Sequence, residues 1–108
     1  MWLVREGEVL AAATAARTHR ERARGLLGRD SATGALVLRP CRQVHTIGMR
    51  FPIDVAFCDR DGVVLRIVTL RPWRLSPLVW RAAMAIEAEP GACERWGLAV
   101  GDRVELKG

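Results

Sequence analysis

Two acidic residues stand inside apolar, strand-like stretches and are the first candidates for chemistry. Asp54 follows the corner made by Pro52, and Glu87 lies within AMAIEA. An acid so placed either accepts backbone hydrogen bonds, pairs with an arginine such as Arg29 or Arg50, or points into a cleft. Two carboxylates that faced one pocket would give the acid and base of a small hydrolase or lyase. We favour the structural roles and keep the catalytic pair as an alternative.

The segment before Asp54 and a later loop supply candidate binding residues. The loop holds two prolines and two tryptophans, a composition typical of a groove wall or of a surface that inserts into a partner. The alternative is that the tryptophans cover the open end of a barrel. The residues that we expect to border a binding cleft are His45, Thr46, Met49, Arg50, Asp54, Trp73, Trp80 and Glu87. Asp102 follows a glycine and is expected to bond its own turn.

Metal and cofactor motifs are absent from the sequence. The two histidines do not form H-x-H or H-x-x-x-H, and no phosphate loop or dinucleotide pattern occurs. The three cysteines, Cys41, Cys58 and Cys93, lie far apart, which favours small buried hydrophobes in a reducing compartment. No run approaches the ~18 apolar residues of a membrane helix. We expect a cytoplasmic protein without cofactor, metal or membrane.

The charge is positive, with 17 Lys and Arg against 12 Asp and Glu, a net charge of +5. Arg20 and Arg24 would share one face of a helix that begins at the Thr18-x-x-Glu21 capping box. All but one of the cations are arginines, which together with many alanines indicates coding bias more than a nucleic-acid surface. Nucleic acid is therefore an unlikely partner, and weak binding through this helix is a further alternative.

The pattern along the chain predicts a mainly β (α+β) fold. Strands are expected in these ranges: 1–4, 9–16, 35–38, 44–49, 54–58, 63–68, 82–89 and 103–106. The run Asp59-Arg60-Asp61-Gly62 predicts a hairpin turn. About six to eight short, mostly antiparallel strands with one longer and one short helix (92–96) favour a compact small barrel or half-barrel. Residues 1–108 are expected to form one domain.

Four ordered motifs resemble the family known as domain of unknown function 192, found in bacteria and archaea. They are VHTIGMRFPIDVAF (44–57), RGLLGR (24–29), Ile86-Glu87-x-x-x-Gly91, and Gly97-Leu98-x-x-Gly101-Asp102-x-Val104. Leu27 stands where the family usually has Met, and His45-Thr46 where many members have an aromatic residue and Met. The resemblance implies a compact, mainly β domain with barrel character and no established activity.

The function expected from these observations is a non-catalytic binding module. Its cleft would be bounded by the 45–54 segment, Glu87 and the loop from Trp73 to Trp80, with an unknown small molecule or a protein as partner. A monomeric bacterial protein is expected. A hydrolase or lyase that uses Asp54 and Glu87 is the second hypothesis.

Overall fold

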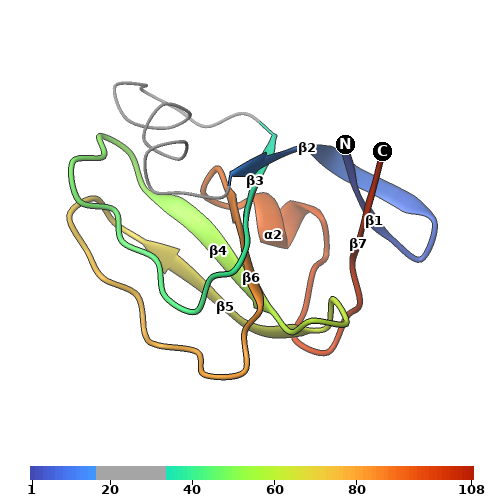
Figure 1. The fold of residues 1–108 in the computed structure, drawn as a ribbon. Helices are drawn as coiled ribbons and strands as arrows, with labels where there is room; N and C mark the ends of the chain where they lie inside the picture. The colour runs from blue at the N-terminus through green and yellow to red at the C-terminus, as the bar shows by residue number, and fades with distance from the viewer. Residues whose placement is uncertain (17–33) are drawn as a thin grey trace.

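The computed structural model describes residues 1–16 and 34–108 (Figure 1). It contains seven strands and one short helix: β1 (Trp2–Arg5), β2 (Glu8–Ala16), β3 (Ala35–Leu38), β4 (Ile53–Cys58), β5 (Val64–Leu70), β6 (Met84–Ala88), α2 (Ala92–Arg95) and β7 (Glu105–Lys107). The longer helix expected from Thr18, with Arg20 and Arg24, lies outside the described residues, as does Arg29, a suggested partner of the two acids. The mainly β class predicted from the sequence is confirmed.

The strands form one mixed sheet in the order β5-β4-β6-β3-β2-β1-β7. Only β2 and β3 pair in parallel; the other neighbours are antiparallel. The two ends of this order are joined by an isolated bridge between Val63 and Arg103 and by backbone hydrogen bonds from Val64 to Asp102 and from Val104 to Gly62. The sheet therefore curls until its edges meet, which gives the barrel character expected from many short strands.

The side chains divide between an interior core and an outer one. Within the barrel lie apolar residues from strands on all sides, among them Leu3, Val37, Ala56, Ile86 and Val104. α2 adds Cys93 to this interior, and Figure 1 shows the helix enclosed by strands. A second cluster, which includes Phe51, Val55 and Phe57, lies on the other face of β4 and β6. Because both faces are covered, β4 is buried along its whole length.

The hairpin predicted at Asp59–Gly62 is confirmed. Asp59 Oδ1 accepts hydrogen bonds from the N–H groups of Asp61 (2.9 Å) and Val63 (3.0 Å), and Gly62 has φ 86°. A Cβ at Gly62 would lie 2.2 Å from the carbonyl oxygen of Val104, so the closing contact of the barrel requires glycine here.

The strand predicted at 44–49 is wrong. Only His45 makes a β-bridge there, to Leu75. The chain turns instead, because the Met49 N–H bonds to the Thr46 carbonyl (3.1 Å) and Gly48 has φ 83°. Apolar alternation alone could not reveal this, since the Thr46 hydroxyl bonds to a distant loop rather than to a sheet neighbour.

Candidate functional site

Asp54 is 4% exposed and fixes the start of α2 to the sheet. Its Oδ2 accepts hydrogen bonds from the N–H groups of Gly91 (3.1 Å) and Cys93 (3.2 Å). Its Oδ1 accepts one from the hydroxyl of Thr69 (2.8 Å), its cross-strand partner on β5. The backbone donors predicted for this acid are confirmed, and its third donor is a hydroxyl rather than an arginine. A carboxylate at a helix N-terminus also meets the favourable end of the helix dipole.

The C-terminal end of α2 is held by a charge of the opposite sign. The Arg5 guanidinium, from β1, donates to the carbonyls of Trp96 (2.8 Å) and Gly97 (2.8 Å) and lies 3.3 Å from Asp102 Oδ2. Asp102 Oδ2 also accepts the N–H of Ala99 (2.9 Å), so its predicted bond to its own turn is confirmed. A four-residue helix cannot form alone, and these two side chains stabilise both of its ends.

Glu87 points away from Asp54. In the β4–β6 register Asp54 lies opposite Ala88, whereas Glu87 lies opposite Val55. Residues directly opposite each other share a face, and successive residues alternate, so the two carboxylates lie on opposite faces of the sheet. Glu87 is 2% exposed beside Val55 and Leu36 of the outer core. The structure does not bring the two acids to one pocket.

Two buried thiols, Cys93 beside Asp54 and Cys58 at the far end of β4, are not nucleophiles at neutral pH. Burial, the Asp54 charge and a hydrogen bond to Asp54 raise the pKa of Cys93 to about 12. Burial raises the pKa of Cys58 to about 12, with smaller contributions from Asp59 and Cys93. Because the thiolate is the reactive form, neither cysteine is suited to catalysis.

Thr46 is fully buried and fastens the loop 71–81 to the segment 41–52. Its hydroxyl donates to the Arg71 carbonyl (2.6 Å) and accepts the Arg74 N–H (2.9 Å), while its carbonyl accepts the Trp73 N–H (2.9 Å). Ser76 and Val44 exchange two further bonds, from the Ser76 N–H to the Val44 carbonyl and from the Val44 N–H to the Ser76 hydroxyl. Thr46 is thus part of the scaffold, and its loop is held at several points.

The loop so held displays large apolar side chains. Trp73 is 64% exposed, and Leu75 and Ile47 are exposed beside it. His45, half-buried, bridges to Leu75 and accepts the Ile47 N–H at Nδ1 (3.3 Å). We call Ile47, Trp73 and Leu75, with His45, the loop face. Among the other expected binding residues, Met49 is buried in the outer core and Arg50 is exposed.

Trp73 adopts a backbone conformation that is unusual for its type, with φ 61°. A residue with a Cβ is strained there by roughly 1–2 kcal/mol. The hydrogen bond from its N–H to Thr46 fixes this geometry and directs a bulky indole to the surface. Both tryptophans of this loop are exposed, Trp73 by 64% and Trp80 by 71%, so most of each indole faces solvent.

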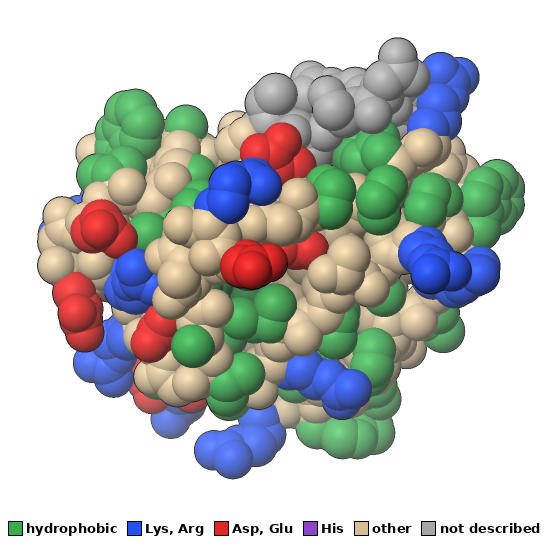
Figure 2. All heavy atoms as spheres, turned by 180° about the vertical axis from the view of Figure 1, so that it is seen from behind, with side chains coloured by type: hydrophobic (Ala, Val, Ile, Leu, Met, Phe, Trp, Pro, Cys, Tyr) green, Lys and Arg blue, Asp and Glu red, His purple; other side chains and the backbone are tan. Residues whose placement is uncertain are grey.

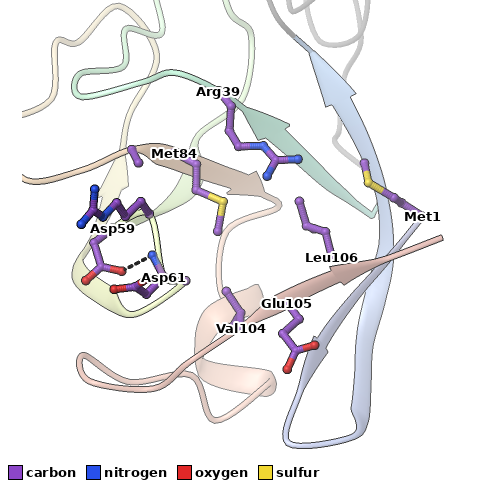
Figure 3. Close-up of a pocket in the computed structure, with 11 residues that line it drawn as sticks. Met1, Arg39, Asp59, Asp61, Met84, Val104, Glu105 and Leu106 are labelled. Atoms are coloured by element: carbon purple, nitrogen blue, oxygen red, sulfur yellow. Dashed lines mark hydrogen bonds between the residues drawn. The ribbon is translucent and has the colours of Figure 1, made fainter.

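The open end of the barrel is a polar pocket (Figure 3). It has a volume of about 380 Å³, and Met84 and Val104 of the interior core contribute to its wall. Arg39 lies at its upper edge in Figure 3, Asp59 and Asp61 bring carboxylates to its rim, and Glu105 of β7 also lines it. It lies where β4 ends and β6 begins, whereas α2 is bonded where β4 begins. No signal in the sequence placed these residues together.

Two further hollows continue from this pocket, and the sequence did not predict them either. One of about 420 Å³ is lined by Arg42, Asp59, Arg60, Asp61, Trp80, Arg81, Ala82 and Ala83. The next, of about 360 Å³, is lined by Leu65, Arg66, Leu78, Val79, Trp80 and Arg81. Trp80 and Arg81 belong to both. Over the described part of the chain, His, Cys, Asp and Glu side chains do not gather in groups of three or more that could hold a metal ion. No described helix is long and apolar enough to cross a membrane.

Comparison with solved structures shows the fold in two bacterial proteins. A protein of unknown function from Novosphingobium aromaticivorans DSM 12444 superposes with a TM-score of 0.72 at 23% identity, covering 87% of this chain and 74% of that one. A suggested transcription regulator from Sinorhizobium meliloti 1021 gives 0.70 at 21% identity, covering 86% and 79%. At these identities the likeness extends to the fold alone.

Sequence relatives come from two species of Pyrococcus. The UPF0127 protein PYRAB11210 of Pyrococcus abyssi is 37% identical over 62 residues, which are 57% of this chain and 53% of the relative. The UPF0127 protein PF1050 of Pyrococcus furiosus is 36% identical over the same share of each chain. The chain thus spans about half the length of the curated relatives that it matches. The model of the DUF192 family, described as "Uncharacterized ACR, COG1430", matches residues 2–106, and the chain belongs to this family.

Proposed function

We propose that this domain, residues 1–108, is a non-catalytic binding module that docks a protein partner through the loop face. The observation that carries the proposal is the conformation of Trp73. A strained, fixed backbone presents an indole that is 64% exposed, with Leu75 and Ile47 beside it. Folding alone gains little from this arrangement, because the indole is not buried and the strain is unfavourable. A partner that covers it would gain both apolar contact and a surface ordered before binding.

The contacts of Thr46, Asp54 and Glu87 support binding over catalysis. The Thr46 hydroxyl bonds to backbone atoms, and the Asp54 carboxylate bonds to backbone N–H groups and to Thr69. Both side chains therefore hold the scaffold together. Glu87 and Asp54 occupy opposite faces of the sheet. A hydrolase that used both carboxylates would need them on one side. The three free cysteines support the further proposal that the module works in a reducing compartment, the cytoplasm.

The proposal is tested by placing a photo-cross-linking residue at Leu75 of the intact protein in its native cells. We expect discrete protein adducts from this position, since Leu75 belongs to the loop face and is 64% exposed. The matched control carries the same residue at Trp2, which is also exposed but lies on β1. Trp73→Ser with the probe at Leu75 should abolish the adducts. Adducts that are the same from both positions, or that survive Trp73→Ser, would overturn the proposal.

A further inference from the structure

Four arginines from separate segments gather around one exposed tryptophan. Arg42, Arg60 and Arg81 line one hollow together with Trp80, and Arg66 and Arg81 line the next, again with Trp80. We call these four arginines and Trp80 the arginine track. They come from the loop after β3, the β4–β5 turn, β5 and the loop before β6, so the fold alone brings them together.

No guanidinium of the track is held in an ion pair within the described residues. Over residues 1–16 and 34–108, ion pairs involve Arg5, Arg95 and Lys107. Three guanidiniums and two carboxylates, those of Asp59 and Asp61, line the first hollow, so its lining keeps a net positive charge. The second hollow contains no acid among its lining residues. Figure 2 shows one face of the molecule, on which basic and acidic side chains lie among hydrophobic ones.

Trp80 adds a flat surface between these charges. It is 71% exposed, and it lines both hollows, each of which also has arginine side chains in its lining. An exposed indole flanked by cations can stack a nucleobase while the cations contact the phosphates on either side. Shallow, connected hollows suit a chain laid along the surface more than an enclosed small molecule.

We propose that the arginine track binds single-stranded nucleic acid, with phosphates at the four guanidiniums and one base stacked on Trp80. This site shares no residue with the loop face, and none of its arginines belongs to the helix expected from Thr18. The ligand is anionic by charge complementarity, and the indole favours a nucleic acid over an acidic protein segment, which has phosphate-like charge but few flat rings. Because side chains at the surface make no base-edge contacts in this arrangement, recognition is independent of sequence.

The test is fluorescence anisotropy with labelled oligo-dT and oligo-U of about 12 nucleotides, titrated with the whole protein. We expect a Kd on the order of 10 µM at about 50 mM NaCl, weakening as salt rises. Four phosphate contacts at about 0.7 each predict a slope of about −3 for log K against log salt. No binding even at about 50 mM NaCl would overturn the proposal, since the phosphate contribution is largest there.

Two variants separate charge from stacking. Arg81→Gln should reduce the salt slope by about 0.7, and Trp80→Ala should weaken binding by about 5- to 150-fold without changing the slope. The matched controls are Arg95→Gln on α2 and Trp2→Ala on β1, which remove the same charge and the same ring elsewhere. If the controls have the same effects as the track variants, the track is not the site.

Competition with oligo-glutamate of equal charge distinguishes the two anionic partners. We expect it to displace the oligonucleotide only weakly, because it cannot stack on Trp80. Equal competition, together with no effect of Trp80→Ala, would overturn the nucleic-acid assignment in favour of an acidic protein segment. Thermal melting of each variant confirms that it is folded, and since the loop face is intact in all of them, these results are independent of the Leu75 cross-linking.

Discussion

At the scale of single residues, Asp54 joins three elements of the fold. Its two oxygens connect β4 to Thr69 of β5 and to the first turn of α2. A buried carboxylate remains acceptable only while its hydrogen-bonding capacity is met, and here each oxygen has a donor. Asp54 belongs to the segment 44–57, which resembles the DUF192 family. Its contacts in the structure are those of a residue that holds the fold together.

Asp54→Asn is expected to lower the free energy of unfolding by about 1–3 kcal/mol, the scale of losing charge-assisted hydrogen bonds. The amide oxygen can still accept from the backbone, but the charge that favours the N-terminus of α2 is lost. Urea denaturation measures the change. Asp61→Asn, at an exposed position of the β4–β5 turn, is the matched control and should change stability by less than about 0.5 kcal/mol. An unchanged or higher stability of Asp54→Asn would contradict the structural role and favour a functional one.

At the scale of elements, the closing contact between the β4–β5 turn and Val104 depends on Gly62. Gly62→Ala combines a positive φ with a Cβ placed 2.2 Å from a backbone oxygen, so the turn must move away. We expect a loss of at least about 3 kcal/mol. Gly101→Ala is the matched control, because its φ is 97° but no atom lies within 4 Å of the added Cβ; it should cost only about 1–2 kcal/mol.

Hydrogen exchange of the Val64 and Val104 amides reports whether Gly62→Ala acts at the closure. Their N–H groups bond to Asp102 and Gly62 across the meeting edges of the sheet. Both should lose protection in Gly62→Ala before the amides of β4 and β6 do. Equal stability of the two glycine variants would show that backbone conformation alone, and not the contact with Val104, governs the position.

Elements set by neighbouring residues could be predicted from the sequence, and those set by distant contacts could not. The Asp59–Gly62 turn is stabilised by the Asp59 carboxylate and by Gly62, which both belong to the turn itself. The short helix after Pro90 was predicted at nearly its observed bounds. The segment 44–49 has the apolar alternation of a strand, yet the hydroxyl of Thr46 bonds to residues that are 25 and 28 positions away along the chain. The opposite orientation of Glu87 follows from strand register, which no local pattern specifies.

At the scale of the whole molecule, the two buried thiols make stability depend on alkaline pH. Their pKa of about 12 in the folded protein exceeds the ordinary value of 9.0. The unfolded chain therefore releases these protons at lower pH than the folded protein does. Stability from this source is fully present below about pH 9 and declines as the pH rises toward 12.

Urea denaturation under reducing conditions at several pH values between about 8 and 11 measures this decline. Cys58→Ala and Cys93→Ala lower stability at every pH through lost packing, but each should also remove about half of the slope that the thiols cause. Wild-type slopes in both variants would mean that the thiols ionise alike in the folded and unfolded states.

The pairing of β1 with β7 has a consequence for how the domain folds. β1 pairs on one edge with β2, which follows it directly, and on the other edge with β7, far along the chain. The Arg5 side chain likewise bonds to the distant carbonyls of Trp96 and Gly97. A hairpin of β1 and β2 can form from local contacts, but its second edge stays unpaired until β7 arrives, and an unpaired strand edge is open to pairing with other chains. Barrel closure is therefore a late step of folding, and until it is complete β1 is the strand most exposed to aggregation.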